Sequence, residues 1–405
     1  MRRIVLLVLL SGLVGSASAV DWSGRAKLEA MTDRYGERAP ESALGYGQSR
    51  ELAGQLRLAF AAGSGHWSLR SAWQLDARTG SALRLERALL TQFPALPQVD
   101  GQGGYWDLDR SIDSGAAHRV EQRLDRLSAA YTGRHLVMRL GRQALTWGNG
   151  QVFHPLDLVN PFQPLATDTV YKRGTDMAYA QWLFDDGSDV QGVFVPHRNA
   201  ADTTALLANM ASGRNQYLLL AARDYGDTVA ALGASGSLGG AAWTATLIPT
   251  RLGDGAVHSS WIANLSHAWL WAGRNTTLFA ELYHNGFGVT GGDYTLGDLP
   301  QALRVRLARG QRFVTGRDYL ALGARVEWTP LLEITPTVIV NTADHSLLAD
   351  LQCSYSLSDN ANFKAGVRLP VGNRGSEFGG LRTRPGEALF LRPPRQLFLR
   401  FERYF

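Results

Sequence analysis

The search for reactive side chains starts with the stretch HPLD, which places His154 near Asp157 in a chain of nine histidines. A Ser-His hydrolase needs a nucleophile, a base and an orienting group held together, and the sequence contains no G-x-S-x-G nucleophile elbow. The single cysteine, Cys353, has no partner for a disulfide, a zinc–thiolate site or an iron–sulfur cluster. We therefore expect no catalytic residue, no metal ligand and no cofactor, although a catalytic group assembled only in space stays open.

Arginine offers a different chemistry. The formal net charge is +5, and lysine occurs only at Lys27, Lys172 and Lys364. A nucleic-acid binder gathers its basic residues on one face or in one tail. Here arginine and acidic residues recur together at alternating positions, so we expect no nucleic-acid partner and predict a charged lumen. Basic rings favour anions; the open alternative is that arginines and acids pair, stiffen the wall and leave little selectivity.

The elements that carry these charges alternate with a period of two. In residues 361–371, Phe363, Val367 and Leu369 lie on one face, and Lys364 and Arg368 lie on the other. Such segments run for about 9–12 residues, the length that a strand tilted by about 45° needs to cross a bilayer. Tryptophan and tyrosine near their ends fit aromatic girdles. The pattern predicts an all-β, transmembrane antiparallel β-barrel, although a soluble sheet would also alternate.

The connections between these segments fall into two lengths. Short ones lie at 61–65, 132–135, 185–188, 272–275 and 357–360, and long ones at 79–118, 147–175, 286–317 and 373–394. Counting strands from a periplasmic start places the short turns in the periplasm and the long loops outside. The count gives about 18 strands, with 16 as the alternative, because residues 199–240 could include a loop helix. A barrel of this size encloses an aqueous channel, so we expect a polar inner face.

The two ends of the chain indicate export to the outer membrane. Residues 1–19 combine a positive start, an apolar run and the cleavage signal Ala17-Ser18-Ala19, which predicts a signal peptide followed by one barrel domain over 20–405. A retained N-terminal anchor is the alternative. The final stretch RQLFLRFERYF resembles the closing strand of Gram-negative outer-membrane barrels, although Arg403 stands where an aromatic residue is usual. That resemblance implies recognition by the barrel assembly machinery and contact with outer-membrane lipid and lipopolysaccharide.

The segment from Leu140 to Pro164 ends a strand at Trp147-Gly148 and continues as a loop rich in proline and apolar residues. Apolar residues in an extracellular loop must pack somewhere, and we expect them to fold into the barrel as a constriction. The motif GRQALTWGNG followed by NPF resembles the porin-like outer-membrane barrels of proteobacteria. More loosely, the whole chain is similar to the alginate-export and phosphate-selective porin barrels. The resemblance implies passage through a lumen narrowed by inward loops. The alternative is that these motifs only end a strand and form a turn.

The sequence thus predicts an outer-membrane channel for passive passage of small hydrophilic, mildly anionic solutes, constricted by loops 147–175 and 286–317. Two alternatives stay open: a dedicated exporter component for a polysaccharide or lipid, and an outer-membrane enzyme or adhesin with a closed barrel. A homotrimer is compatible with the size of the chain. The predicted pore-lining or constriction residues are Arg25, Arg57, Arg70, Arg139, Gln143, Trp147, Asn149, Asp157, Asn160, Arg325, Glu327, Lys364, Arg368 and Arg400.

Overall fold

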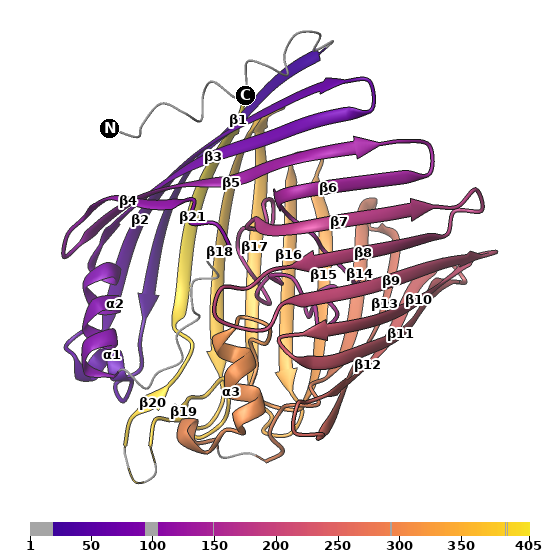
Figure 1. Ribbon diagram of the computed structural model, residues 1–405. Coiled ribbons are helices and arrows are strands. Elements are labelled where there is room, and N and C mark those ends of the chain that lie inside the picture. Colours follow the sequence, from indigo (N-terminus) through magenta and orange to yellow (C-terminus); the bar gives the residue numbers. More distant parts are fainter. Residues whose placement is uncertain (1–18, 94–103, 149, 292–293, 385, 387) are drawn as a thin grey trace.

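The computed structural model describes residues 19–93, 104–148, 150–291, 294–384, 386 and 388–405. Its architecture is one large antiparallel ring of strands, with three short helices at one end (Figure 1). The predicted signal peptide lies almost entirely outside the described residues. None of the described helices is long and apolar enough to span a membrane.

Eighteen strands form the wall. They are β1 (Ala19–Arg34), β2 (Gln48–Ser64), β3 (Trp67–Gly80), β5 (His118–Thr132), β6 (Leu136–Gln143), β7 (Thr175–Leu183), β8 (Asp189–Val195), β9 (Thr203–Ser212), β10 (Asn215–Asp224), β11 (Asp227–Leu238), β12 (Ala241–Arg251), β13 (Val257–Trp271), β14 (Arg274–His284), β15 (Asp318–Thr329), β16 (Leu332–Asn341), β17 (Leu347–Ser358), β18 (Ala361–Val371) and β21 (Arg395–Tyr404).

The ring closes because β1 pairs with β2 on one side and with β21 on the other. A short additional strand, β4 (Asp109–Ser114), pairs with β5 beyond the point where β6 ends. The predicted count of 18 is confirmed, and the alternative of 16 is wrong. The helix considered for residues 199–240 is also wrong, since this stretch contains β9, β10 and β11, which pair in sequence.

The two ends of the barrel differ as the connection lengths predict. The C-terminus lies at one end, together with the start of β1 at Ala19 and tight turns such as Gly65-His66 and Gly239-Gly240 (Figure 1). The other end carries the long connections, with their short helices and a small hairpin. These are α1 (Pro40–Ala43), α2 (Ser81–Gln92), η1 (Leu296–Asp298), α3 (Gln301–Ala308) and the hairpin β19 (Leu381–Arg382) and β20 (Phe390–Leu391). Following the porin arrangement, we call the first end periplasmic and the second extracellular.

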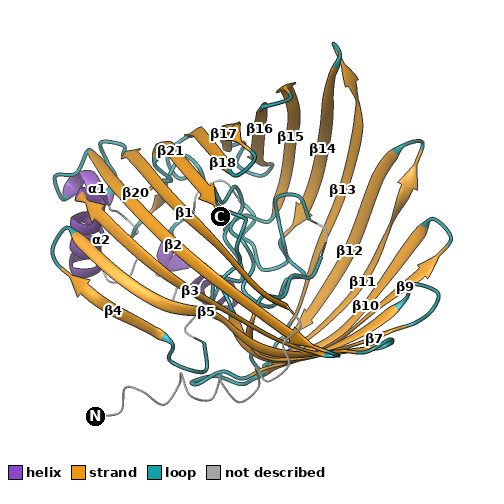
Figure 2. Cartoon of the chain, turned by 90° about the horizontal axis from the view of Figure 1, so that it is seen from above, coloured by secondary structure: helices purple, strands orange, loops and turns teal. Residues whose placement is uncertain are grey.

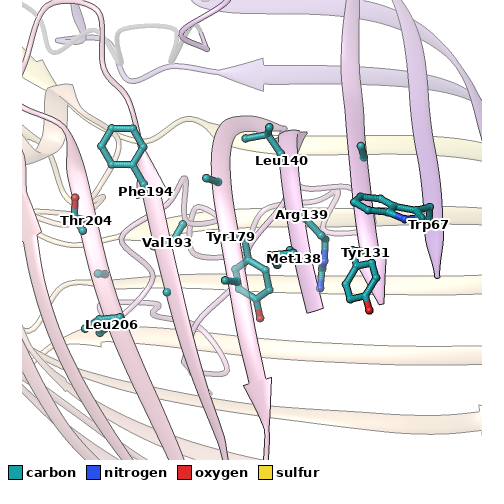
Figure 3. A pocket seen from close by; sticks show the side chains of 15 residues that line it. Trp67, Tyr131, Met138, Arg139, Leu140, Tyr179, Val193, Phe194, Thr204 and Leu206 are labelled. Carbon is teal, nitrogen blue, oxygen red and sulfur yellow. The ribbon is translucent and has the colours of Figure 1, made fainter. Parts of the chain in front are cut away.

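The outer face of the wall is apolar and exposed. Leu140, Leu206 and Leu282 leave 62%, 60% and 47% of their surface uncovered. Such a belt is stable only against lipid, so the chain is an outer-membrane barrel. A hollow of about 570 Å³ lies on this wall, where small residues of β7 and β8 lie between larger side chains. Figure 3 labels Leu140 and Phe194 among the side chains that line it.

The inner face is divided into two halves. On β18, β21, β1, β2, β3, β5 and β6 it carries cations among acids, and we call it the basic half. Its cations are Arg25, Lys27, Arg57, Arg70, Arg78, Arg119, Arg123, Arg126, Arg139, Lys364, Arg368 and Arg400.

On β7 to β17 the inner face toward the extracellular end is instead a row of buried apolar side chains, which we call the apolar half. It runs from Met177, Val193 and Val195 through Leu207, Leu220 and Ile248 to Tyr283, Tyr319 and Ile339. The expectation of a polar inner face is therefore wrong for this half, because loop residues cover the wall and exclude water from it.

Candidate channel lining

The segment of residues 144–174, called the strap below, connects β6 to β7 and lies within the ring of strands (Figure 2). Trp147, Leu156 and Val159 are buried in the cluster formed with the inner faces of β7 to β12. The indole Nε1 of Trp147 donates a hydrogen bond of 2.9 Å to Gln191 of β8. This part of the strap covers the apolar half with apolar side chains and satisfies its one indole donor.

The strap also reaches β14 and β15. The ring of Phe153 stacks on Tyr283 at a centroid distance of 4.6 Å and lies 5.5 Å from that of Tyr319. The carboxylate of Glu281, fully buried, accepts hydrogen bonds from the backbone N–H groups of residues 151, 152 and 153 at 2.6, 3.0 and 2.8 Å. A charged acceptor for three backbone donors makes this a strong anchor.

Inside the strap, Asp157 and Lys172 form a buried ion pair of 2.5 Å. Lys172 also donates to the carbonyl of Leu145. Burial raises the pKa of Asp157 to about 6, against the opposing field of Lys172, and burial lowers the pKa of Lys172. Asn160 has a positive φ of 57° and donates to the carbonyl of Arg173 at 3.1 Å. Asp157 and Asn160 therefore hold the strap together, and neither faces an open lumen.

The last part of the strap crosses to the basic half. Asp168 accepts hydrogen bonds from Arg25 at 2.9 and 3.1 Å and from Lys27 at 2.9 Å. The ring of Tyr171 lies 4.8 Å from the guanidinium of Arg25 and 4.4 Å from that of Arg57. Burial raises the pKa of Asp168, but the hydrogen bond from Arg25 and the charge of Lys27 outweigh burial and hold this pKa well below its usual range.

A cavity of about 500 Å³ lies on the lumen side of β1, β2, β3, β5 and β6, between the wall and Tyr171. Four guanidinium side chains line it: Arg57, Arg70, Arg126 and Arg139. One lining carboxylate, Asp21, opposes them, and Arg57 and Arg126 share Asp125. Among the described residues, Arg70 has no ion-pair partner, and Arg139 contacts only the ring of Tyr179, at 4.9 Å. Positive charge is in excess here.

The connection from β14 to β15 is fixed to the far side of the barrel. Arg306 of α3 forms an ion pair of 2.6 Å with Asp227 and lies 3.8 Å above the ring of Phe287. Gln311 donates to Asp224 at 2.8 Å. Arg306 and Arg309, the latter lying 4.1 Å from the ring of Tyr225, therefore hold this loop against the ends of β10 and β11.

The predicted site residues separate into groups. Arg25 and Arg57 meet at Tyr171, and Arg70 and Arg139 line the cavity described above, with Gln143 beside them. Three more contact the strap or its partners: Arg400 binds Thr167 and Glu29, Arg368 binds Asp350 and the carbonyl of Leu165, and Lys364 lies 3.4 Å from Glu402. Arg325 and Glu327 are elsewhere, exposed at the periplasmic end of β15, where they contact Glu333 and Asn275. Asn149 lies outside the described residues.

Sequence reasoning did not single out Asp168, Tyr171, Arg126 or Glu281. Asp168 and Tyr171 fall inside the loop that was expected to constrict the lumen, yet nothing in the local sequence separates them from other loop residues. Glu281 had a weak signal, since it is an acid at an inward position between the aromatic residues Phe279 and Tyr283. Among the described residues no group of three or more His, Cys, Asp or Glu side chains could hold a metal ion.

The fold has clear relatives among solved structures. OccK9 (OpdG) of Pseudomonas aeruginosa matches with a TM-score of 0.57 and 13% identity, over 95% of this chain and 97% of that chain. OccK5 (OpdH) of the same organism matches with a TM-score of 0.55 and 9% identity, over 95% of this chain and 98% of that chain. OccAB4 of Acinetobacter baumannii matches with a TM-score of 0.55 and 7% identity, over 96% of this chain and 99% of that chain. No family model and no curated protein matches the sequence.

Proposed function

We infer the function of this chain from its fold, the porin-like outer-membrane barrel predicted from the sequence, whose structural neighbours are outer-membrane porins. We propose that this chain is a passive channel for small hydrophilic solutes and that it prefers anions. The cavity with four guanidinium groups supports the anion preference most directly, because Arg70 and Arg139 face it without an acidic partner among the described residues. Rings of basic side chains favour anions in pores. No enzymatic activity is part of this proposal.

The same proposal gives the strap and the loop of residues 286–317 the role of constriction. In support of it, the strap leaves β6, contacts β14 and β15 through Phe153, and returns to β1 through Asp168. A segment held at both sides of the lumen reduces the open cross-section. The loop of residues 286–317 contributes by packing on β10 and β11 at the extracellular end.

The test is single-channel recording of the refolded mature protein, together with a variant that lacks residues 149–165. We expect stable open steps that enlarge in the variant, and a reversal potential in a KCl gradient that indicates anion preference. A cation-selective reversal potential would refute the anion preference. A barrel that stays silent with and without the deletion would refute the channel itself.

The predicted partners stay part of the proposal. Phe405 ends β21 with 61% of its surface exposed, on the same outward face as Leu399 and Phe401, as expected of a C-terminal assembly signal. Deletion of Phe405 should reduce the amount of folded barrel in the outer membrane without preventing refolding in detergent. The mass of the detergent-solubilised particle would test the trimer.

A further inference from the structure

A short part of the strap differs from the rest in what holds it. Residues 166–171, called the tongue below, lie between two anchors, Leu165 and Lys172. The carbonyl of Leu165 accepts from Arg368, and that of Lys172 accepts from Arg126. Between these anchors, the described contacts of the tongue with the barrel wall are made by cationic side chains alone: Arg400 on Thr167, Arg25 and Lys27 on Asp168, and Arg25 and Arg57 on Tyr171.

The geometry at Asp168 is that of a bound carboxylate. Both of its oxygens accept from the two terminal nitrogens of Arg25, and Lys27 adds a third charged donor. The paired guanidinium–carboxylate arrangement is the strongest and most specific mode for recognising this group. Arg25 is 2% exposed, and Gln55 accepts from its Nη2 at 2.6 Å, so the receiving side is preformed by the wall.

The tongue can leave this position while the strap stays in place. Val152, Phe153 and Leu156 are 2–3% exposed, whereas Val170 and Tyr171 are 44% and 40% exposed. The apolar burial that holds the strap therefore ends before the tongue begins. Because few buried apolar contacts hold the tongue, it can open without unfolding the rest of the strap, provided that another anion replaces Asp168 on its cationic partners.

We propose that Asp168 is a tethered competitor for a carboxylate-binding site formed by Arg25 and Lys27, and that a permeating carboxylate solute takes this site by displacing the tongue. The inference rests on the anion preference proposed above. The exchange replaces one carboxylate by another on the same donors, so that neither Arg25 nor Lys27 is left buried and unpaired. Displacement of the tongue also withdraws Tyr171 from between Arg25 and Arg57 and widens the basic path.

The experiment measures block of single-channel chloride current by succinate in the full-length mature barrel and in Asp168→Asn. Loss of a tethered competitor, whose effective concentration is on the order of millimolar, should lower the half-blocking succinate concentration by about tenfold. Glu121→Gln is the matched control. It removes one carboxylate on the lumen face of β5, which is 53% exposed, lies 3.9 Å from Arg119, and is neither part of the cavity lining nor a partner of Arg25. We expect a change of less than about twofold in this control, since exposed charges are screened by salt.

Equal effects of Asp168→Asn and Glu121→Gln would overturn the inference, because they would show a general charge effect. An unchanged or raised half-blocking concentration in Asp168→Asn would also overturn it. Should that variant not refold, the wild-type protein still decides: a tethered competitor makes the rate of block level off at high succinate, whereas a rate that stays linear contradicts displacement. If the wild-type protein prefers anions but Asp168→Asn leaves the half-blocking succinate concentration unchanged, only the displacement of the tongue is refuted. A cation-selective wild-type protein would refute the proposed anion preference.

Discussion

The two halves of the inner wall place opposite demands on the loops. The basic half presents charged groups such as Arg70, Asp76 and Arg123, which water and counter-ions can solvate. The apolar half presents side chains such as Val195, Leu207 and Ile248, which are 1–2% exposed only because the strap lies on them. Burying this surface stabilises the strap by roughly 25 cal/mol for each Å² removed from water.

The difference between these halves shows how the strap, a long loop without regular secondary structure, is held in one position. An apolar wall attracts the apolar part of the strap and fixes it, and the remaining width of the lumen lies along the wall that stays wet. The apolar half thus determines where the open lumen lies, although the basic half lines it. Each of the following predictions changes one half and uses the other half, or the outside of the barrel, as its control.

The largest effect is expected from Phe153→Asp, which places a charge in the contact between the strap and the apolar half. Loss of the aromatic packing alone costs about 3–5 kcal/mol, and the buried carboxylate adds to this cost. We expect larger and noisier current steps, or failure to refold. Val170→Asp, in the exposed tongue, should leave refolding intact. Unchanged current steps in Phe153→Asp would show that the contact of Phe153 with Tyr283 and Tyr319 does not hold the strap.

A smaller effect is expected from Lys172→Met, which leaves the carboxylate of Asp157 buried without its counter-charge and the carbonyl of Leu145 without its donor. Breaking a buried pair in this way costs about 3–5 kcal/mol, felt here by the strap more than by the wall. Protease cleavage of the strap in the refolded barrel should accelerate. The control is Asp185→Asn, which breaks a solvent-exposed pair with Arg134 in a periplasmic turn and should cost less than about 1 kcal/mol.

Neutralising the basic half should change selectivity without changing stability. In the double variant Arg70→Gln and Arg139→Gln, the anion-to-cation permeability ratio should fall by about two- to fivefold, since removal of two lumen charges weakens the field that favours anions. The reversal potential in a KCl gradient measures this ratio. Arg223→Gln changes an arginine on the outward face of β10 and should leave the ratio unaltered. Equal shifts of the reversal potential in both variants would show that the cavity does not cause the anion preference.

The smallest effect is a pH dependence within the strap. The pKa of Asp157 is raised by burial to about 6, above its value in an unfolded chain. The folded form therefore binds this proton more tightly, so its contribution to stability is present at low pH and is lost as pH rises through about 6. The urea midpoint of the refolded barrel should lose this contribution between about pH 4 and about pH 7, from the ordinary pKa of an aspartate through the raised pKa of Asp157. In Asp157→Asn the urea midpoint should not show this pH-dependent loss. An identical pH profile in both proteins would exclude a contribution of Asp157.

Much of the fold follows from the sequence. Period-two alternation in stretches such as residues 361–371 requires one face in lipid and one away from it, and the strand β18 has that register with β17 and β21. The stretch 203–212 was less secure, because Ala205 and Leu207 are apolar on the lumen side as well. A strand that is apolar on both faces loses the alternation that identifies it.

Less of the candidate lining could be predicted. Arg25, Arg57 and Arg400 were placed on the inner face by alternation alone, and the structure has them there. Asp157 was expected near the lumen but is buried within the strap beside Lys172, 15 residues away along the chain. Asp168 was not predicted, because its partners Arg25 and Lys27 are separated from it by more than 140 positions.

The sequence by itself determined the barrel, an approximate strand number and the face on which most strands carry charge, because these follow from a local period and from the lengths of the connections. Only the tertiary structure decided which wall the strap covers and which carboxylate lies on Arg25, because those contacts join strands and loops far apart in the chain. Their free energies depend on complementary surfaces that no local pattern encodes.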